Sequence, residues 1–392
     1  MGVARRWWLL GSLAAVLAAS VALPLAMYFR DYLDNPLRPS VASVETWGVV
    51  WPMLRAAPAY YGDRVGGGDV ERLALRLSAK SSRRIAAKRA EAIRRGVLFA
   101  SREDFVPAAL EVGRRTVAVD VRLKGDLGDH WARRRWSLRV EVEDGGEVLG
   151  LRRFSLHPPW VRGFHTEPLF FDLLRSVGLI APRTAFVELV INGRDIGLMG
   201  VEEHLASALV QAHQRPPGVL LKLDEAPLWQ AWVRAAEVRG VPWSLAVPKP
   251  RVEDDWRNAP IDPFERRALR RSPERSAELA RASQLLRGVA AGAIAPSAAF
   301  DAGLWGRFLA YCEVFGAPHM VLWNNLRFYF NPLSGRLEPV AFDSGVLPER
   351  DHRQLPAGAS FICLGGHMEF TDTLVADPVV RDAFLKALRT LE

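Results

Sequence analysis

Two oxygen-bearing side chains flank a segment with the pattern of a β-hairpin near the end of the sequence. Asn325 precedes it, and Asp343 lies at its far end in FYFNPLSGRLEPVAFDSG, residues 328–345. An amide oxygen and a carboxylate at the two ends of a hairpin can converge on a hard cation such as Mg²⁺. The glycine after the acid allows the turn that aims it. Each residue taken alone has a structural alternative, with Asp343 capping a turn and Asn325 ending a helix.

Side chains that suit a phosphate ligand occur earlier, in sequence with the pattern of strands. Lys124 lies in RLKGDLGDH, where two glycines let the backbone come close to a ligand. Arg135 opens the strand-like stretch RWSLRVEV. Phosphoryl transfer needs cations over the phosphates and carboxylates that hold those cations in place. The acids that can pair with these bases are Glu167, Glu202 and Glu203.

The elements that would position these residues change character near residue 226. Between residues 104 and 225, alternating apolar residues predict a mainly antiparallel sheet, with an Asn-Gly hairpin turn and one packed helix. Helical periods dominate from residue 226 until the hairpin. We therefore expect an α+β fold, with a strand-rich lobe at 99–225 and a helical lobe at 226–392 that carries the hairpin. A cleft between two such lobes is a common place to hold a nucleotide.

The first 98 residues predict an anchor followed by a connector. Residues 7–29 carry no charge and, as a helix, are long enough to cross a hydrocarbon core about 30 Å thick. Paired arginines precede this span, so we expect residues 1–30 to form a transmembrane anchor with the bulk of the chain on the extracytoplasmic side. A cleaved signal peptide is the alternative, and it also exports the chain. Residues 31–98 are interpreted as a linker and a basic helix at 70–95.

Composition excludes several classes of protein. The 392 residues are 49% hydrophobic and 24% charged, which is typical of a globular chain. A formal charge of +8 suits contact with phosphates, anionic lipids or acidic polymers. Nucleic-acid binding would rest on that charge alone, so we expect no nucleic-acid partner. The sequence has no Gly-x-Ser-x-Gly elbow of a serine hydrolase and no His and Asp set with the spacing of a metallohydrolase.

Five stretches, taken in order, resemble the CotH family of kinase-like proteins, named for a spore coat protein. They are VRLKGDLGDHW, RRWSLRV, the segment from RRFSLHPPW to GVEEH, GVLLKLDEA, and NNLRFYFNPLSGRLEPVAFDSG. The resemblance runs from about residue 100 to the end and is greatest to a membrane-anchored bacterial branch. It implies an atypical protein-kinase fold of two lobes that binds ATP with Mg²⁺ and phosphorylates protein side chains. Relatives continue the final helical segment, so we expect the second lobe to be shortened or the chain to be a fragment.

The resemblance also implies roles for single residues. The metal ligands of the family fall on Asn325 and Asp343, which makes Asp343 the principal catalytic candidate. Typical members place a catalytic Asp five or six residues before the ligand Asn, where this chain has His319, a side chain that can take a proton near neutral pH. The family's lysine falls on Arg135 and its strand acid on Glu203. The expected nucleotide-binding set is Lys124, Arg135, Glu167, Glu203 and Lys222.

Three functions follow from these patterns. The first is an ATP- and Mg²⁺-dependent kinase that acts on an envelope or coat protein at the cell surface. The second is a kinase-like pseudoenzyme that binds a nucleotide or an acidic ligand and organises surface assembly. The third is an anchored module that binds an anionic cell-surface polymer without any nucleotide.

Overall fold

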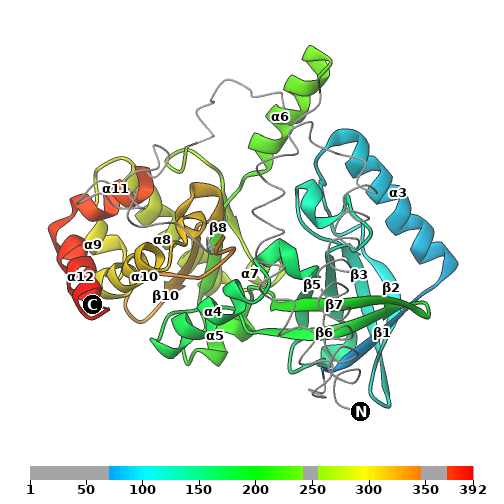
Figure 1. Cartoon of the computed structure of the whole chain (residues 1–392). Coiled ribbons are helices and arrows are strands. Elements are labelled where there is room, and N and C mark those ends of the chain that lie inside the picture. The colour runs from blue at the N-terminus through cyan, green and yellow to red at the C-terminus, as the bar shows by residue number, and fades with distance from the viewer. Residues whose placement is uncertain (1–69, 242–254, 346–368, 392) are drawn as a thin grey trace, which may run out of the picture.

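The computed structural model describes residues 70–241, 255–345 and 369–391. The first half of this part of the chain forms a closed β-barrel, drawn on the right of Figure 1. The order around the barrel is β1-β2-β3-β4-β5-β7-β6. The strands are β1 (Arg72–Leu77), β2 (Val106–Val112), β3 (Arg115–Leu123), β4 (Leu138–Val142), β5 (Arg153–His157), β6 (Thr184–Ile191) and β7 (Arg194–Glu203).

Period-two alternation separates the two faces of the barrel wall. Residues such as Val121, Val140 and Phe154 point inward and are completely buried. Their neighbours along the same strands carry polar side chains on the outer face. Neighbouring strands are antiparallel, except that β1 and β6 pair in parallel and close the barrel. The predicted Asn-Gly turn joins β6 to β7, and both of its residues have positive φ, as a type I′ turn requires.

Helix α3 (Ala79–Arg95) covers part of the barrel. The Ser78 side chain accepts a hydrogen bond from the Ser81 amide at its start, and Gly96 ends it with a φ of 77°. Ile85 and Ala92 bury its apolar stripe. The predicted helix at 70–95 was therefore wrong over residues 70–78, because Arg72–Leu77 forms strand β1 and the helix begins only at Ala79.

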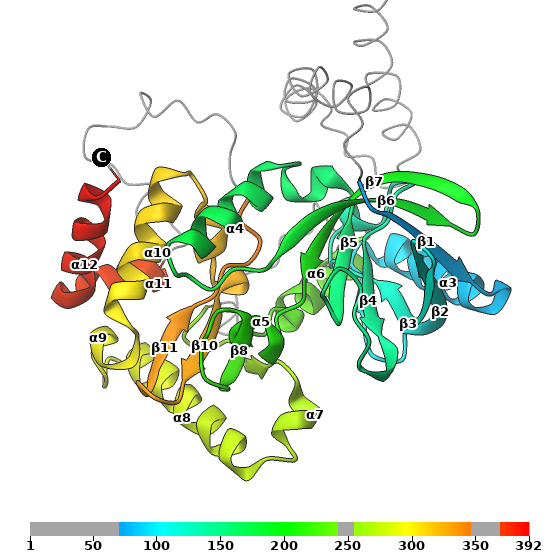
Figure 2. The ribbon, with the colours of Figure 1, turned by 90° about the horizontal axis from the view of Figure 1, so that it is seen from below.

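The second half combines a small sheet with helices. The sheet order is β11-β10-β8-β9, all antiparallel. Figures 1 and 2 show helices beside this sheet, with α6 projecting away from the body. The strands are β8 (Val219–Leu223), β9 (Ile261–Pro263), β10 (Arg327–Asn331) and β11 (Arg336–Pro339). The helices are α4 (Thr166–Ser176), α5 (Ser207–Ala212), α6 (Ala226–Arg239), α7 (Arg266–Leu269), α8 (Pro273–Ala290), α9 (Pro296–Ala299), α10 (Ala302–Val314), α11 (Glu369–Ala376) and α12 (Pro378–Arg389).

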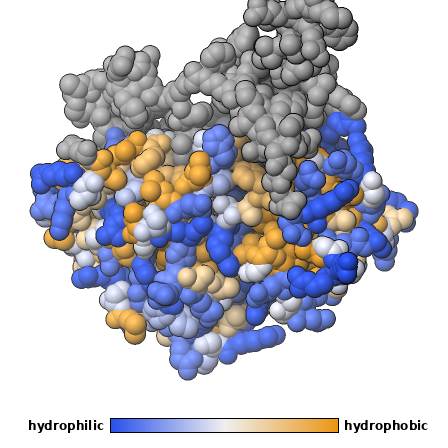
Figure 3. Space-filling view, turned by 60° about the horizontal axis from the view of Figure 1, so that its bottom comes forward, coloured by the Kyte–Doolittle hydropathy of each residue, from blue (hydrophilic) through white to orange (hydrophobic). Residues whose placement is uncertain are grey.

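An aromatic cluster holds the second half together. The rings of Phe300, Trp305, Phe328 and Phe370 lie 5.3–6.2 Å apart, mostly edge to face, and all four are buried. They come from the segment before α10, from α10 itself, from β10 and from α11. The hairpin that leads to Asp343 is therefore anchored on a rigid core. On the face shown in Figure 3, hydrophilic residues predominate and hydrophobic residues gather in patches between them.

The mixed α+β class is confirmed, with two corrections of detail. The strand-rich part is a closed seven-stranded barrel rather than an open antiparallel sheet, and the second half contains four strands besides its helices. The kinase-like two-lobed arrangement stays a prediction. The expected transmembrane helix falls within residues 1–69, outside the described ranges. Among the helices that are described, none combines the length and apolar composition of a membrane span.

Candidate functional site

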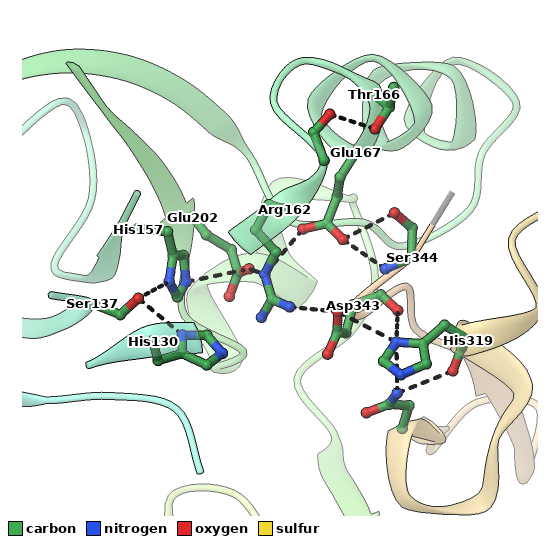
Figure 4. A network of polar contacts seen from close by, with 12 residues as sticks. His130, Ser137, His157, Arg162, Thr166, Glu167, Glu202, His319, Asp343 and Ser344 are labelled. Atoms are coloured by element: carbon green, nitrogen blue, oxygen red, sulfur yellow. Dashed lines mark hydrogen bonds and ion pairs between the residues drawn. The ribbon is translucent and has the colours of Figure 1, made fainter. Parts of the chain in front are cut away.

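A buried arginine that the sequence did not single out lies at the centre of the polar network in Figure 4. Arg162 ends a short 3₁₀ turn, Pro159–Arg162, between β5 and α4. Gly163 follows with a φ of 63°, and a Cβ there would lie 2.4 Å from the Thr166 hydroxyl. The Arg162 side chain is only 9% exposed. Its guanidinium contacts three carboxylates, one five residues later in the chain and two from distant segments.

The three carboxylates belong to α4, β7 and the segment after β11. Nε of Arg162 lies 3.0 Å from Glu202 Oε2 and 3.3 Å from Glu167 Oε1, and Nη1 contacts Asp343 Oδ1. The other Glu167 oxygen accepts hydrogen bonds from the Ser344 amide at 2.6 Å and the Ser344 hydroxyl at 2.9 Å. The network therefore joins the barrel, α4 and the hairpin segment through one cation.

Burial and ion pairing set the protonation of these acids. Burial raises the pKa of Glu167 to about 7, although Arg162 opposes the shift. Burial would also raise the pKa of Asp343, but Arg162 and His319 hold it well below its usual range. Burial opposes the charge of Glu202 as well, and there Lys124 and Arg162 hold the pKa well below its usual range. Two of the three acids are thus firmly anionic.

Lys124 continues the network along the outer face of the barrel. Its Nζ lies 3.5 Å from Glu202 Oε1 and 3.1 Å from His157 Nε2. Nδ1 of His157 contacts the Ser137 hydroxyl at 3.0 Å, and this hydroxyl also contacts Nδ1 of His130 at 2.9 Å. Burial lowers the pKa of Lys124 to about 8 and that of His157 to about 3. The lysine therefore has a neutral imidazole on one side and a carboxylate on the other.

Asp343 and Asn325 meet at the His319 ring. Nδ1 of His319 lies 3.5 Å from Asp343 Oδ1, and the Asn325 amide nitrogen lies 3.2 Å from the same ring nitrogen. That amide also donates to the His319 carbonyl at 3.1 Å. The contact with Asp343 raises the pKa of His319. Asp343 has a φ of 51°. Gly345 approaches His319 so closely that an added Cβ would lie 2.6 Å from the His319 Cβ and 3.0 Å from the ring carbon Cγ.

The ring of Phe342 forms an apolar floor under the cations. Nζ of Lys124 lies 5.8 Å from its centroid, and the guanidinium carbons of Arg162 and Arg327 lie 5.6 and 4.1 Å from it. Such contacts favour positive charge at this position. The Phe342–Asp343 pair thus offers an aromatic face and a carboxylate to the same group of bases.

The structure brings five of the predicted residues into this network and leaves three outside it. Lys124, Glu167, His319, Asn325 and Asp343 take part. Arg135 instead lies over the Trp160 ring at 5.5 Å. Glu203 forms a two-pronged ion pair with Arg183 at 2.9 and 2.7 Å. Lys222 lies on β8, with Nζ 3.9 Å from Asp262.

Alternation along β7 explains why Glu202 takes the place expected for Glu203. The two acids are adjacent on one strand, so their side chains point to opposite sides. Glu202 pairs in register with Ser155 on the outer face of the barrel. Both acids were candidates from the sequence, and the fold shows that Glu202 is the one that contacts Lys124 and Arg162.

The residues present do not form a magnesium site in this conformation. Asp343 and Asn325 have suitable oxygen donors, but Asp343 already pairs with a guanidinium and the Asn325 amide nitrogen donates to a histidine carbonyl. Within residues 70–241, 255–345 and 369–391, no group of three or more His, Cys, Asp and Glu side chains is arranged to hold a metal ion.

Arg162 and Lys124 can place two positive charges beside an anionic ligand, and Asp343 and Glu202 hold those cations in position. This is the charge arrangement that phosphate recognition requires. Of the two basic groups, only Lys124 could have been found from its glycine-rich surroundings. The only sequence signal of Arg162 is a charged residue between aromatic and apolar neighbours in PPWVRGF.

Comparison with known families agrees with part of this reading. Residues 121–239 match the family model described as CotH kinase protein. The matched segment runs from the end of β3 to the end of α6, so it includes Lys124, Arg162, Glu167 and Glu202 but ends before His319. No curated protein matches the chain. Over residues 121–239, the chain is therefore similar to the CotH kinase family.

Proposed function

We propose that this protein is a CotH-like kinase that binds ATP against Lys124 and Arg162 and transfers a phosphoryl group to a protein side chain. The observation that carries the proposal is the buried Lys124–Glu202–Arg162–Asp343 network, which lies between the barrel and the hairpin segment. A lysine held by a glutamate and an aspartate brought in from a distant turn are the parts with which kinases hold phosphates.

The roles of the residues follow from their contacts. Lys124 and Arg162 would neutralise phosphate oxygens, and Glu202 would hold both cations in place. His319 would take the proton from the accepting hydroxyl when its ring is neutral, because its side chain is 44% exposed and lies next to Asp343. Magnesium would supply further positive charge only if the ion pair between Asp343 and Arg162 broke. Comparing stabilisation by ATP with and without Mg²⁺ tests this.

A protein substrate in the envelope or coat, a membrane anchor and an extracytoplasmic position complete the proposal. They are supported by the apolar stretch at 7–29 and by the paired arginines before it. An exported site would need a nucleotide supply outside the cytoplasm.

The test is stabilisation of the full-length chain by nucleotide, followed by phosphate transfer. A ligand at a hundred times its Kd raises the unfolding free energy by about 2.7 kcal/mol. We expect ATP to raise the unfolding temperature of the wild type and of Asp382→Ala, an exposed position on α12, and to have little effect on Asp343→Ala. Radiolabel transfer that continues at the full rate in Asp343→Ala would end the proposal.

A pseudoenzyme that binds a nucleotide without turnover is the second candidate. It is favoured by the pairing of Asp343 with Arg162 and by a histidine, rather than a carboxylate, beside Asp343. The two candidates separate in one experiment, because the pseudoenzyme would be stabilised by ATP and yet show no radiolabel transfer above that of Asp343→Ala.

A further inference from the structure

A second group of cations lies on the same outer face of the barrel as Lys124, further along the strands. Arg122 on β3 faces Arg139 on β4, which faces Ser155 on β5, which faces Glu202 on β7. This row runs straight across four strands. Its first two members are like charges in directly opposed positions, an arrangement that destabilises a sheet unless something compensates.

Arg139 is buried, Arg122 is half-buried, and both are incompletely paired. Arg139 is 9% exposed, and Ser155 is not exposed at all. The Nε atoms of Arg122 and Arg139 and the Ser155 hydroxyl are buried, and none of them has a hydrogen-bond partner among the described residues. Neither arginine forms a salt bridge with a carboxylate in that part of the chain. Arg122 donates a hydrogen bond to the neighbouring Leu123 carbonyl at 2.8 Å, and Arg139 contacts His204 Nδ1 at 2.6 Å.

A pocket of about 450 Å³ opens beside this row. Five arginines line it, from three regions, the segment after α3, the barrel and α7. They are Arg102, Arg122, Arg153, Arg266 and Arg267. The pocket also contains the ring of Phe105, which stacks on the Arg122 guanidinium at 5.0 Å. Positive charge therefore surrounds the cavity from several sides.

Two acids line the same pocket, and both have partners already. Glu265 pairs with Arg153 and accepts a hydrogen bond from the Ser207 amide at 2.9 Å. Glu141 lies 3.7 Å from Arg102. Arg122 and Arg139 have no direct ion pair among the described residues, although Glu141 acts on both at longer range and Glu202 acts on Arg139.

Electrostatics show that this arrangement costs stability in the absence of a ligand. Burial and the neighbouring Arg122 lower the pKa of Arg139 to about 9. Burial and Arg139 also lower the pKa of His204, so its ring is neutral. A buried charge without a direct ion pair is unfavourable. An anion bound in the pocket beside Arg122 would reduce this cost.

We infer that the pocket beside Arg122 and Arg139 binds a phosphoryl anion and is separate from the centre at Asp343. Arg122 lines this pocket, and arginine forks match phosphate oxygens in pairs. Arg139 and Ser155 follow Arg122 in the same row and lie outside the lining, so Arg139 contributes its charge from behind Arg122. Lys124 comes directly after β3, two residues beyond Arg122, so a bound anion would lie next to the Lys124 network. The phosphoryl group could belong to the same nucleotide or to a separate phosphorylated molecule. The inference does not depend on the proposed kinase activity.

Inorganic phosphate, titrated calorimetrically into the full-length chain, is the direct probe. We expect Arg122→Gln and Arg139→Gln to weaken phosphate binding by about tenfold or more, since a hydrogen bond to a charged group is worth that factor. Arg115→Gln is the matched control, because Arg115 starts the same strand and is exposed. Asp343→Ala should bind phosphate as the wild type does, which separates this site from the nucleotide proposal.

Modification of the wild-type chain keeps the inference testable if a variant fails to fold. Phosphate should protect Arg122 and Arg139 from phenylglyoxal, as read by mass spectrometry, and leave Arg115 reactive. Competition then identifies the source of the anion. ATP that displaces phosphate indicates one shared ligand, whereas ATP and phosphate that bind together indicate two. No phosphate binding by the wild type, or binding that is unchanged within twofold in both arginine variants, would overturn the inference.

Discussion

Replacing Arg162 by methionine should destabilise the fold strongly. Its guanidinium contacts Glu202 at 3.0 Å and Glu167 at 3.3 Å and also pairs with Asp343. Each contact supplies about 5 kcal/mol of Coulomb attraction at an effective dielectric constant of about 20. Most of this attraction is offset by the desolvation of buried ions. Methionine keeps much of the volume but leaves three buried acids without their shared cation, so we expect the free energy of unfolding to fall by about 3–5 kcal/mol.

The loss should shrink as the pH falls. Without Arg162, the pKa of each buried acid rises above its value in the unfolded chain. Such groups favour the folded state below the unfolded pKa, near pH 4, and this contribution is lost as the pH rises through the folded pKa. Urea unfolding of the full-length wild type and variant at about pH 5 and pH 8 measures both values. The difference between the two proteins should be larger at pH 8.

Arg152→Met is the control for this experiment. Nε of Arg152 lies 3.2 Å from Glu147 Oε1, a distance similar to those at Arg162, but both side chains are about half exposed or more. An exposed pair contributes less than about 1 kcal/mol. A loss at Arg162 no larger than at Arg152, or one that grows on acidification, would refute the assignment of Arg162 as the cation that the three acids share.

Three further outcomes follow from the site. Glu202→Gln should weaken ATP binding about tenfold, as expected for a charge-assisted contact, and Glu203→Gln should leave it unchanged within twofold. Calorimetry measures both affinities. A larger effect of Glu203→Gln would show that Glu203, the acid expected from the sequence, has the role assigned to Glu202. Burial lowers the pKa of Lys124 to about 8, so between about pH 8 and 10.5 the unfolded chain binds more protons than the folded chain. As the pH rises through this range, the wild type should gain up to about 3 kcal/mol of unfolding free energy that Lys124→Met does not gain. Equal pH profiles of the two proteins in urea unfolding would contradict this. Gly125→Ala places a Cβ 2.0 Å from the His130 ring. Gly113 also has positive φ but has open space around it, so Gly113→Ala should lower the unfolding free energy by only about 1–2 kcal/mol, and Gly125→Ala should lower it by more. Equal melting temperatures of the two variants would argue against the close approach at Gly125.

Local patterns predicted the elements that depend on local chemistry. The Asn-Gly turn between β6 and β7 and the helix that ends near Gly178 follow from turn and cap preferences that act over a few residues. The hairpin of β10 and β11 was equally visible. Closure of the barrel could not be predicted from local patterns, because it depends on a parallel pairing between β1 and β6, which lie more than a hundred residues apart.

The candidate site shows the same division. Asp343, Asn325 and Lys124 carry local signals, since each lies beside glycines or at the end of a hairpin. Arg162 also precedes a glycine, but its importance comes from three acids that meet only after folding. Arg135 was chosen because it opens a strand-like stretch and because the family's lysine falls on it. Its contact with Trp160 could not be inferred from strand alternation, because β4 begins only at Leu138.

The position of β1 determines where a soluble fragment can begin. A fragment that starts at residue 99, the expected boundary of the strand-rich part, would lack Arg72–Leu77 and leave β2 and β6 with unpaired backbone edges. Open edges of this kind recruit strands from other molecules. Expression of residues 99–391 should therefore yield aggregates, whereas a fragment that begins near residue 70 keeps the ring of strands intact.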